Sequence, residues 1–77
     1  MARVRQFEHI ASAAKAHPTE VDCGYQTVRA GGETLLQLST YGSDLRKSEK
    51  KVSQTLQFDR DTAAELVAII RQTFPGL

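Results

Sequence analysis

A short basic segment is the part of the sequence whose chemistry is easiest to interpret. Residues 46–51 read Arg-Lys-Ser-Glu-Lys-Lys, so four positive charges and one negative charge fall within six positions. Clustered lysine and arginine side chains neutralise the phosphates of a nucleic-acid backbone. The candidate phosphate-binding residues are Arg46, Lys47, Lys50 and Lys51. The alternative is a solvated loop whose charges only keep the protein soluble.

Neutral polar side chains and a tyrosine lie on both sides of the basic segment in the sequence. Hydroxyl and amide groups hydrogen-bond phosphates, sugars and base edges, and a tyrosine ring stacks on bases. The candidates are Tyr41 as the stacking ring, with Ser53 and Gln57 as polar contacts. The alternative is an ordinary solvated face of an antiparallel sheet, which the residue types alone favour.

The histidines and the single cysteine lack the spacing that metal binding requires. His9, His17 and Cys23 match no zinc-ligand pattern, and Cys23 is typical of a small core residue. The pair Gly31-Gly32 falls between two expected strands, whereas a phosphate-binding glycine loop joins a strand to a helix. Nothing pairs a serine and an aspartate with a histidine as a catalytic triad requires. We therefore expect no metal, no cofactor and no enzymatic activity.

Composition narrows the class of protein further. The 77 residues, 40% of them hydrophobic, suit one small folded domain spanning 1–77. No stretch approaches the ~20 apolar residues of a membrane-spanning helix, and no apolar signal-peptide run follows the N-terminus. A single cysteine excludes an intramolecular disulfide and fits a reducing compartment. We therefore expect a soluble cytoplasmic protein that does not contact a membrane.

The small size of the chain favours a homodimer. A domain of this length buries only about 60% of its unfolded surface, and its core supplies only about 3–5 kcal/mol. No disulfide or metal motif adds to that stability. A second copy would add buried surface, and a marginally stable monomer is the alternative.

Alternating residues predict three strands in the middle of the chain. Residues 21–29, 34–41 and 51–58 alternate with a period of two, as half-buried strands do. Gly31-Gly32 tolerate the positive backbone angles of a tight hairpin turn. One face of the predicted sheet is apolar. The other is expected to carry Asp22, Gln26, Gln37, Ser39, Tyr41, Ser53, Thr55 and Gln57.

The two ends of the chain give signals of different strength. Thr62 and Glu65 have capping-box spacing, and Pro75-Gly76 ends the helix that they predict. Its apolar stripe consists of Ala63, Leu66, Val67, Ile70 and Phe74. At the N-terminus, the sequence allows either a helix over Val4–Ala16 or an edge strand over Arg3–His9 with only the alanine run helical. The expected fold is α+β, a three- to four-stranded antiparallel meander with a C-terminal helix packed on one face and a possible N-terminal helix.

Three runs of residues give the chain a family resemblance. Residues 36–44 and 51–59, with the closing run 69–75, resemble a group of small uncharacterised bacterial proteins. The likeness extends back to His17 and so covers most of the chain. Some members are labelled methionyl-tRNA formyltransferase-like, but the chain is far too short for a formyltransferase domain. This resemblance implies a family without an established activity.

The order of elements resembles a second, more distant family. Strand, strand, basic loop, strand and final helix are similar to the single-stranded-DNA-binding domain of the transcriptional coactivator called positive cofactor four. That resemblance implies a homodimer formed through the helices, with the sheet and its basic loop binding single strands. The implied dimer residues on the helix are Leu66, Ile69, Ile70 and Phe74.

Two functions from different classes remain. The first is a nucleic-acid-binding module, for single-stranded DNA, that acts as a homodimer through the basic loop and the polar sheet face. The second is a protein-interaction accessory subunit with no nucleic-acid contact, for which Leu35, Ile69 and Leu77 are apolar residues outside the main stripe.

Overall fold

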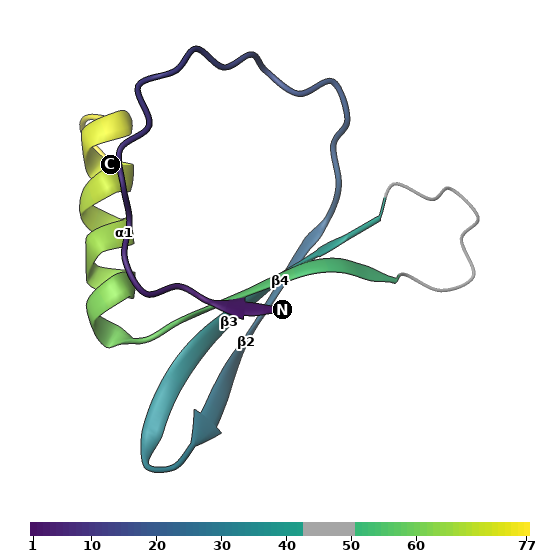
Figure 1. Ribbon diagram of the computed structural model, residues 1–77, viewed down its shortest axis with the longest axis vertical. Helices are drawn as coiled ribbons and strands as arrows, with labels where there is room; N and C mark the ends of the chain where they lie inside the picture. The colour runs from purple at the N-terminus through teal and green to yellow at the C-terminus, as the bar shows by residue number, and fades with distance from the viewer. Residues whose placement is uncertain (43–50) are drawn as a thin grey trace.

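Four strands and one helix make up the described part of the chain. The computed structural model describes residues 1–42 and 51–77. The elements are β1 (Ala2–Arg3), β2 (Cys23–Ala30), β3 (Glu33–Tyr41), β4 (Val52–Phe58) and α1 (Arg60–Thr73). They form one mixed sheet in the order β1-β4-β3-β2, with α1 following the sheet (Figure 1). The expected α+β class is confirmed.

The three long strands form the expected antiparallel unit. β2 pairs with β3, and β3 pairs with β4, and both pairs are antiparallel. Gly31 and Gly32 connect β2 to β3 with φ values of 58° and 80°. Two consecutive positive φ values are what a tight hairpin turn requires, and glycine adopts them without a steric penalty. The predicted strands and turn are therefore confirmed, with ends shifted by no more than two residues.

The register gives the sheet two chemically different faces. Leu36 lies opposite Phe58, and Leu38 lies opposite Leu56. We call the side that holds these four residues the apolar face. The alternate residues form the polar face, which consists of Gly24, Gln26, Gln37, Ser39, Tyr41, Thr55 and Gln57, with the apolar pair Val28 and Leu35 at its end near the β2–β3 turn.

The N-terminal region differs from both sequence-based alternatives. β1 has only two residues and pairs with β4 in parallel, so the sheet is not a purely antiparallel meander. Residues 4–22 contain no helix, and the alanine run is exposed. A short helix is marginal in water unless it buries an apolar face. Here Phe7 stacks instead on Phe58, with 6.2 Å between ring centroids, which holds the start of this segment against β4.

The helix opens within residues 59–61, as the sequence indicates, but its capping box lies three residues earlier than expected. The cap is Asp59, whose Oδ1 accepts a hydrogen bond from the Thr62 backbone N–H at 2.9 Å. The Thr62 hydroxyl in turn accepts from the Asp59 backbone N–H at 3.0 Å. The capping box is therefore Asp59 with Thr62, not Thr62 with Glu65. An aspartate directly after the strand can satisfy the free N–H groups of the first turn, which is why the helix starts there.

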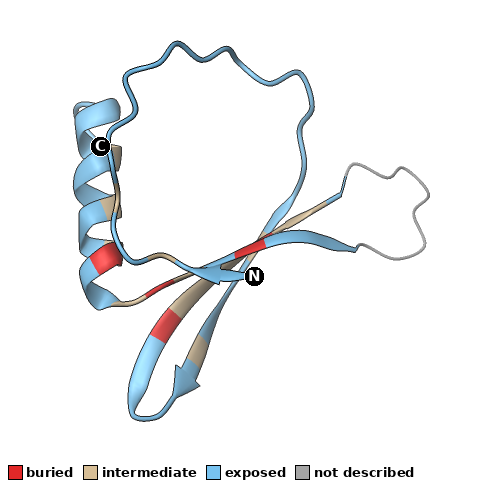
Figure 2. Ribbon diagram, viewed as in Figure 1, coloured by how far each residue is buried: buried red, intermediate tan, exposed pale blue. Residues whose placement is uncertain are grey.

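Burial within the chain is sparse. Among the described residues, the buried hydrophobic side chains are Leu35, with 5% of its surface exposed, and Phe58, with 3% (Figure 2). Leu35, expected on a partner surface, is therefore part of the chain's own core. α1 contacts β3 and β4 beside one end of the sheet, and Leu56 of the apolar face stays 43% exposed. The helix thus covers only part of the apolar face.

Candidate nucleic-acid interface

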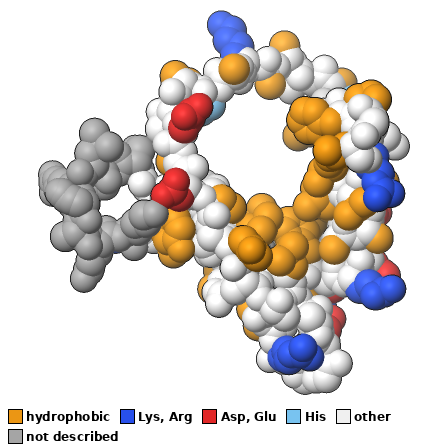
Figure 3. Space-filling view, turned by 180° about the vertical axis from the view of Figure 1, so that it is seen from behind, with side chains coloured by type: hydrophobic (Ala, Val, Ile, Leu, Met, Phe, Trp, Pro, Cys, Tyr) orange, Lys and Arg blue, Asp and Glu red, His pale blue; other side chains and the backbone are white. Residues whose placement is uncertain are grey.

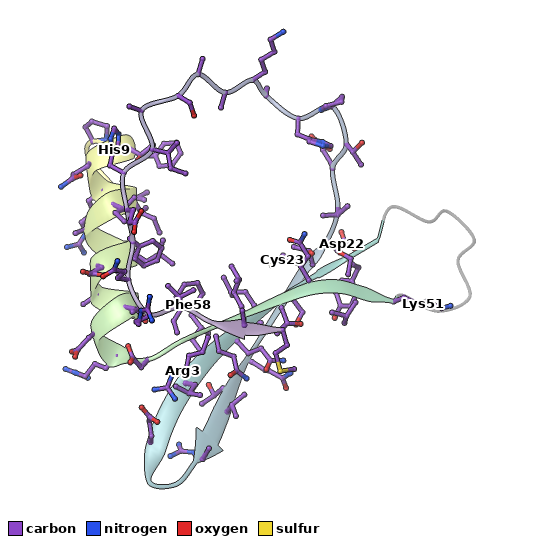
Figure 4. All side chains as sticks on the ribbon, in the orientation of Figure 1. Arg3, His9, Asp22, Cys23, Lys51 and Phe58 are labelled. Carbon is purple, nitrogen blue, oxygen red and sulfur yellow. The ribbon has the colours of Figure 1, made fainter. Side chains whose placement is uncertain are left out.

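Three of the predicted binding residues meet at one end of the hairpin formed by β3 and β4. Tyr41 pairs with Val52 in the sheet, and Lys51 and Ser53 flank Val52 in the sequence. The Lys51 carbonyl oxygen accepts a hydrogen bond from the Gly42 N–H at 3.0 Å, which ties the two strand ends together. Lys51 is exposed at the outer end of β4 (Figure 4). The other predicted cations, Arg46, Lys47 and Lys50, lie outside the described residues.

An irregularity in the strand pairing places Ser53. The register shifts between Thr40 and Tyr41, because Thr40 pairs with Gln54 whereas Tyr41 pairs with Val52. Ser53 is the extra residue of this bulge, and bulges redirect side chains. Its hydroxyl oxygen lies 3.0 Å from the Thr40 hydroxyl oxygen. Ser53 is therefore exposed at the site while it is anchored to the neighbouring strand.

The Tyr41 ring lies against the backbone of Gly24 on β2. A Cβ atom built at Gly24 would lie 2.8 Å from the Tyr41 hydroxyl oxygen and 3.4 Å from a ring carbon. Any larger residue at position 24 would require the end of the Tyr41 side chain to shift. Tyr41 is half-buried in this position, and its backbone N–H donates to the Asp22 carbonyl oxygen at 3.1 Å. Gly24 thus leaves the room that the Tyr41 ring, the predicted stacking ring, occupies.

Gly24 is a site residue that the sequence analysis missed. The alternating strand pattern places Gly24 in a strand but gives it no role of its own. A glycine inside a strand often marks a close approach by another group, and that is the signal that could have identified it.

Two open recesses lie on either side of Tyr41. One, of about 500 Å³, is lined by His17, Thr19, Val21, Thr40, Tyr41, Gly42, Ser53 and Gln54. The other, of about 210 Å³, is lined by Gly24, Tyr25, Gln26, Gln37, Ser39 and Tyr41. Most of these groups are neutral hydrogen-bond donors and acceptors. Tyr41 therefore borders two recesses that share β3, one of them completed by β4 and the other by β2.

Gln57 lies apart from this cluster. It is four residues beyond Ser53 on β4, which corresponds to roughly 13 Å along a strand. Its side-chain N–H donates to the Gln37 amide oxygen at 2.8 Å, across the polar face. Ser39 and Thr55 form the next cross-strand pair, with 3.3 Å between their hydroxyl oxygens. Gln57 thus belongs to a ladder of paired polar side chains.

The described charges are arranged differently at the other end of the sheet. Arg3 forms ion pairs with Glu33 at 2.6 Å and with Asp59 at 3.5 Å, so β1, β3 and the helix cap are joined there. The pKa of the Arg3 guanidinium is raised, first of all by its hydrogen bond to Glu33. The pKa of the Asp59 carboxyl is lowered, first of all by the Thr62 backbone N–H. Arg3 is therefore committed to acidic partners.

The four helix residues expected at a dimer interface have different surroundings. Leu66 and Ile70 are half-buried within the chain, whereas Ile69 is exposed and Phe74 is 60% exposed. Val67, which the sequence pattern places in the apolar stripe of the helix, is also exposed. The helix therefore has one apolar row turned toward its own chain and further apolar residues outside it.

The described residues also bear on the expectations about metals and membranes. No group of three or more His, Cys, Asp or Glu residues lies together in residues 1–42 and 51–77 as a metal site would require. Cys23 is exposed, so its expected core position is wrong. Within the same ranges, no helix has the length and apolar character needed to cross a bilayer.

Comparisons of the chain with protein-family models, with curated proteins and with solved structures gave no significant match.

Proposed function

We propose that the chain is a nucleic-acid-binding module for single-stranded DNA and that it acts as a homodimer. Arg46, Lys47, Lys50 and Lys51 hold the phosphates, and Tyr41 stacks on a base. Ser53 contributes a hydroxyl beside the ring, and Gln57 extends the polar contacts along β4. The module has no catalytic role.

The observation that carries this proposal is the position of Tyr41. The ring rests on Gly24, borders two polar recesses, and lies next to the strand end that carries Lys51. Proteins that bind single strands without sequence preference stack the bases on aromatic rings beside a basic groove. A paired duplex keeps its bases inside, so a stacking ring favours single strands over duplexes.

The test is a titration of fluorescent single-stranded DNA, duplex DNA and RNA, read by anisotropy at several salt concentrations. We expect the tightest binding for single-stranded DNA, with log K falling steeply as log salt rises. In the double variant Lys50→Ala/Lys51→Ala, the salt slope should flatten by about 1.4, since each lost phosphate contact on a single strand removes about 0.7.

A charge-matched control removes two cations from the opposite end of the sheet. Arg29 pairs with Thr34 near the hairpin turn, and Arg60 opens α1. Arg29→Ala/Arg60→Ala should keep the wild-type slope. Equal slopes in both double variants and the wild type, or no binding to any of the three nucleic acids at low salt, would overturn the proposal.

A protein-interaction subunit is the second candidate. The observation that favours it is the number of large hydrophobic side chains left exposed among the described residues. Such a subunit would be recovered with a stable partner that survives nuclease treatment and high salt. Recovery of that partner together with flat nucleic-acid titrations would favour this candidate over the first.

A further inference from the structure

The chain exposes far more surface than a compact monomer of its size. Its accessible surface is 7024 Å², whereas a compact monomer of this mass exposes about 4,700 Å². Its radius of gyration is 14.8 Å, compared with about 11.5 Å for a compact domain of this length. The excess surface is about 2,300 Å² per chain. A protein with so much uncovered surface is incomplete as a single copy.

Much of the uncovered surface surrounds an opening. Figure 3 shows a hole through the molecule, with hydrophobic side chains along the parts of its rim that the sheet and the helix form. In Figure 1 the same space is enclosed by α1, the sheet and the arc of residues 4–22. An open hollow of about 770 Å³ lies where α1 meets the sheet. No residue of the arc 4–22 belongs to its lining. The lining combines the apolar residues Leu36, Phe58, Ala63, Ala64 and Val67 with the polar residues Glu33, Thr34, Asp59, Arg60 and Asp61.

The helix has two apolar rows, and only one is covered by its own chain. Thr62, Leu66 and Ile70 follow one another at intervals of four and are buried or half-buried. Ala63 and Val67 form the neighbouring row and line the hollow, and Val67 is 45% exposed. The small side chains of Ala63 and Ala64 let another helix approach closely, since helices pack about 8–10 Å apart.

We infer that α1 of a second copy of this chain occupies the hollow, so that each copy places its Val67 row against the apolar face and helix of the other. The exposed row and the hollow belong to the same chain, so a two-fold arrangement satisfies both at once. The inference rests on the homodimer of the proposed function and specifies its contact. It does not depend on nucleic-acid binding.

The area supports a second copy as the occupant. Obligate homodimers bury roughly 1,000–2,500 Å² on each partner, and their contacts resemble a domain core cut in half. The excess of about 2,300 Å² per chain falls in that range. A small ligand could cover only a fraction of this surface, which makes another chain of the same kind the better fit.

The first test compares two helix variants by light scattering after size exclusion, across a wide range of protein concentration. The wild-type protein should have twice the chain mass. Val67→Asp should raise the dimer dissociation constant by about 100-fold or more, because it would bury an unpaired carboxylate. The matched control is Gln72→Asp, an exposed position five residues further along and about 140° around the helix, which should remain dimeric.

A second measurement on the wild-type protein keeps the inference testable if Val67→Asp fails to fold. A mixture of isotope-labelled and unlabelled chains should give NOEs between the Val67 methyl groups of one chain and Leu36 or Leu56 of another. A dimer without those NOEs, or one that Val67→Asp leaves intact, would overturn this contact and leave the homodimer standing. A monomer at every concentration would overturn both, while the anisotropy titration would still decide nucleic-acid binding.

Discussion

On the polar face of the sheet the side chains bond to one another, whereas on the apolar face they border open space. Gln57 bonds to Gln37, and Ser39 lies within hydrogen-bond distance of Thr55. No buried polar side-chain atom in the described residues lacks a hydrogen-bond partner. The buried polar groups of this face are therefore satisfied within one chain.

The apolar face is built from residues that gain stability only when water is removed from them. Phe58 achieves this by stacking on Phe7 under the start of the helix, whereas Leu56, two residues away on the same face, remains exposed. Each fully buried side chain of this size contributes about 1.5–3 kcal/mol. The difference between the faces is that buried hydrogen-bonding groups find partners inside the chain, whereas part of the apolar face stays exposed.

The largest effect should come from the most deeply buried side chain of the apolar face. Phe58→Ala should lower the free energy of unfolding by about 3–5 kcal/mol, since it removes a ring that is almost fully buried. Thr55 is buried on the opposite face of the same strand. Thr55→Ala should cost only about 1–3 kcal/mol, through the hydroxyl of Ser39 that loses its partner.

Urea denaturation at one fixed protein concentration measures both variants, because the stability of a dimer depends on concentration. If Thr55→Ala destabilised the protein more than Phe58→Ala, the polar ladder and not the apolar face would dominate stability. That result would reverse the comparison between the two faces.

A smaller and more local effect is expected at the end of the polar face. Gly24→Ala places a Cβ atom 2.8 Å from the Tyr41 hydroxyl oxygen and should displace the ring. Tyr41→Ala should weaken single-strand binding by about 1–3 kcal/mol, the usual contribution of one stacked base. Gly24→Ala should weaken binding in the same direction but less, with little change in stability, because the end of a tyrosine side chain can shift.

Gly42→Ala is the matched control for this substitution. Its added Cβ atom would come no closer than 4.0 Å to the Lys51 carbonyl oxygen, so no group must move. Anisotropy titration should give Gly42→Ala the wild-type affinity. Unchanged affinity in Gly24→Ala and Tyr41→Ala together would remove Tyr41 from the binding site and leave the polar face without a ligand role.

The strands could be predicted because their signal is local. The alternation around Gln37 and Gln57 places both on one face, and the two glycines of the turn fix which residues pair. The candidate site at Tyr41, Lys51 and Ser53 followed from the same pattern, since a hairpin brings its two strand ends together. The bulge at Ser53 carries no comparable signal, because an extra residue changes the register without changing the residue types.

The N-terminal segment could not be predicted for a physical reason. Val4, Phe7 and Ile10 have helical spacing, and alanine favours helices, but local preference is weak and tertiary contacts override it. The stacking of Phe7 on Phe58 joins residues 51 positions apart, and nothing in the local sequence indicates that contact. Gly24 differs, because a glycine inside a strand is itself a sign of a close approach, although it does not indicate that Tyr41 is the approaching group.

The smallest predicted effect concerns Asp59, which joins the edge of the sheet to the helix. Its folded-state pKa is lowered, so its contribution to stability is present above the unfolded pKa and is lost as pH falls through the folded value. Asp59→Asn keeps a good cap and removes this titration. In urea midpoints taken from neutral to acidic pH, the variant should lose less stability than the wild type.

Asp61→Asn is the matched control, because it removes an exposed carboxylate from the same helical turn and leaves the Asp59 cap intact. It should follow the acid decline of the wild-type protein. An equal decline in Asp59→Asn would mean that the cap hydrogen bonds to Thr62 and the ion pair with Arg3 do not couple the helix to the sheet. The acid sensitivity would then have to arise elsewhere, and the junction would not be what holds α1 beside the uncovered apolar face.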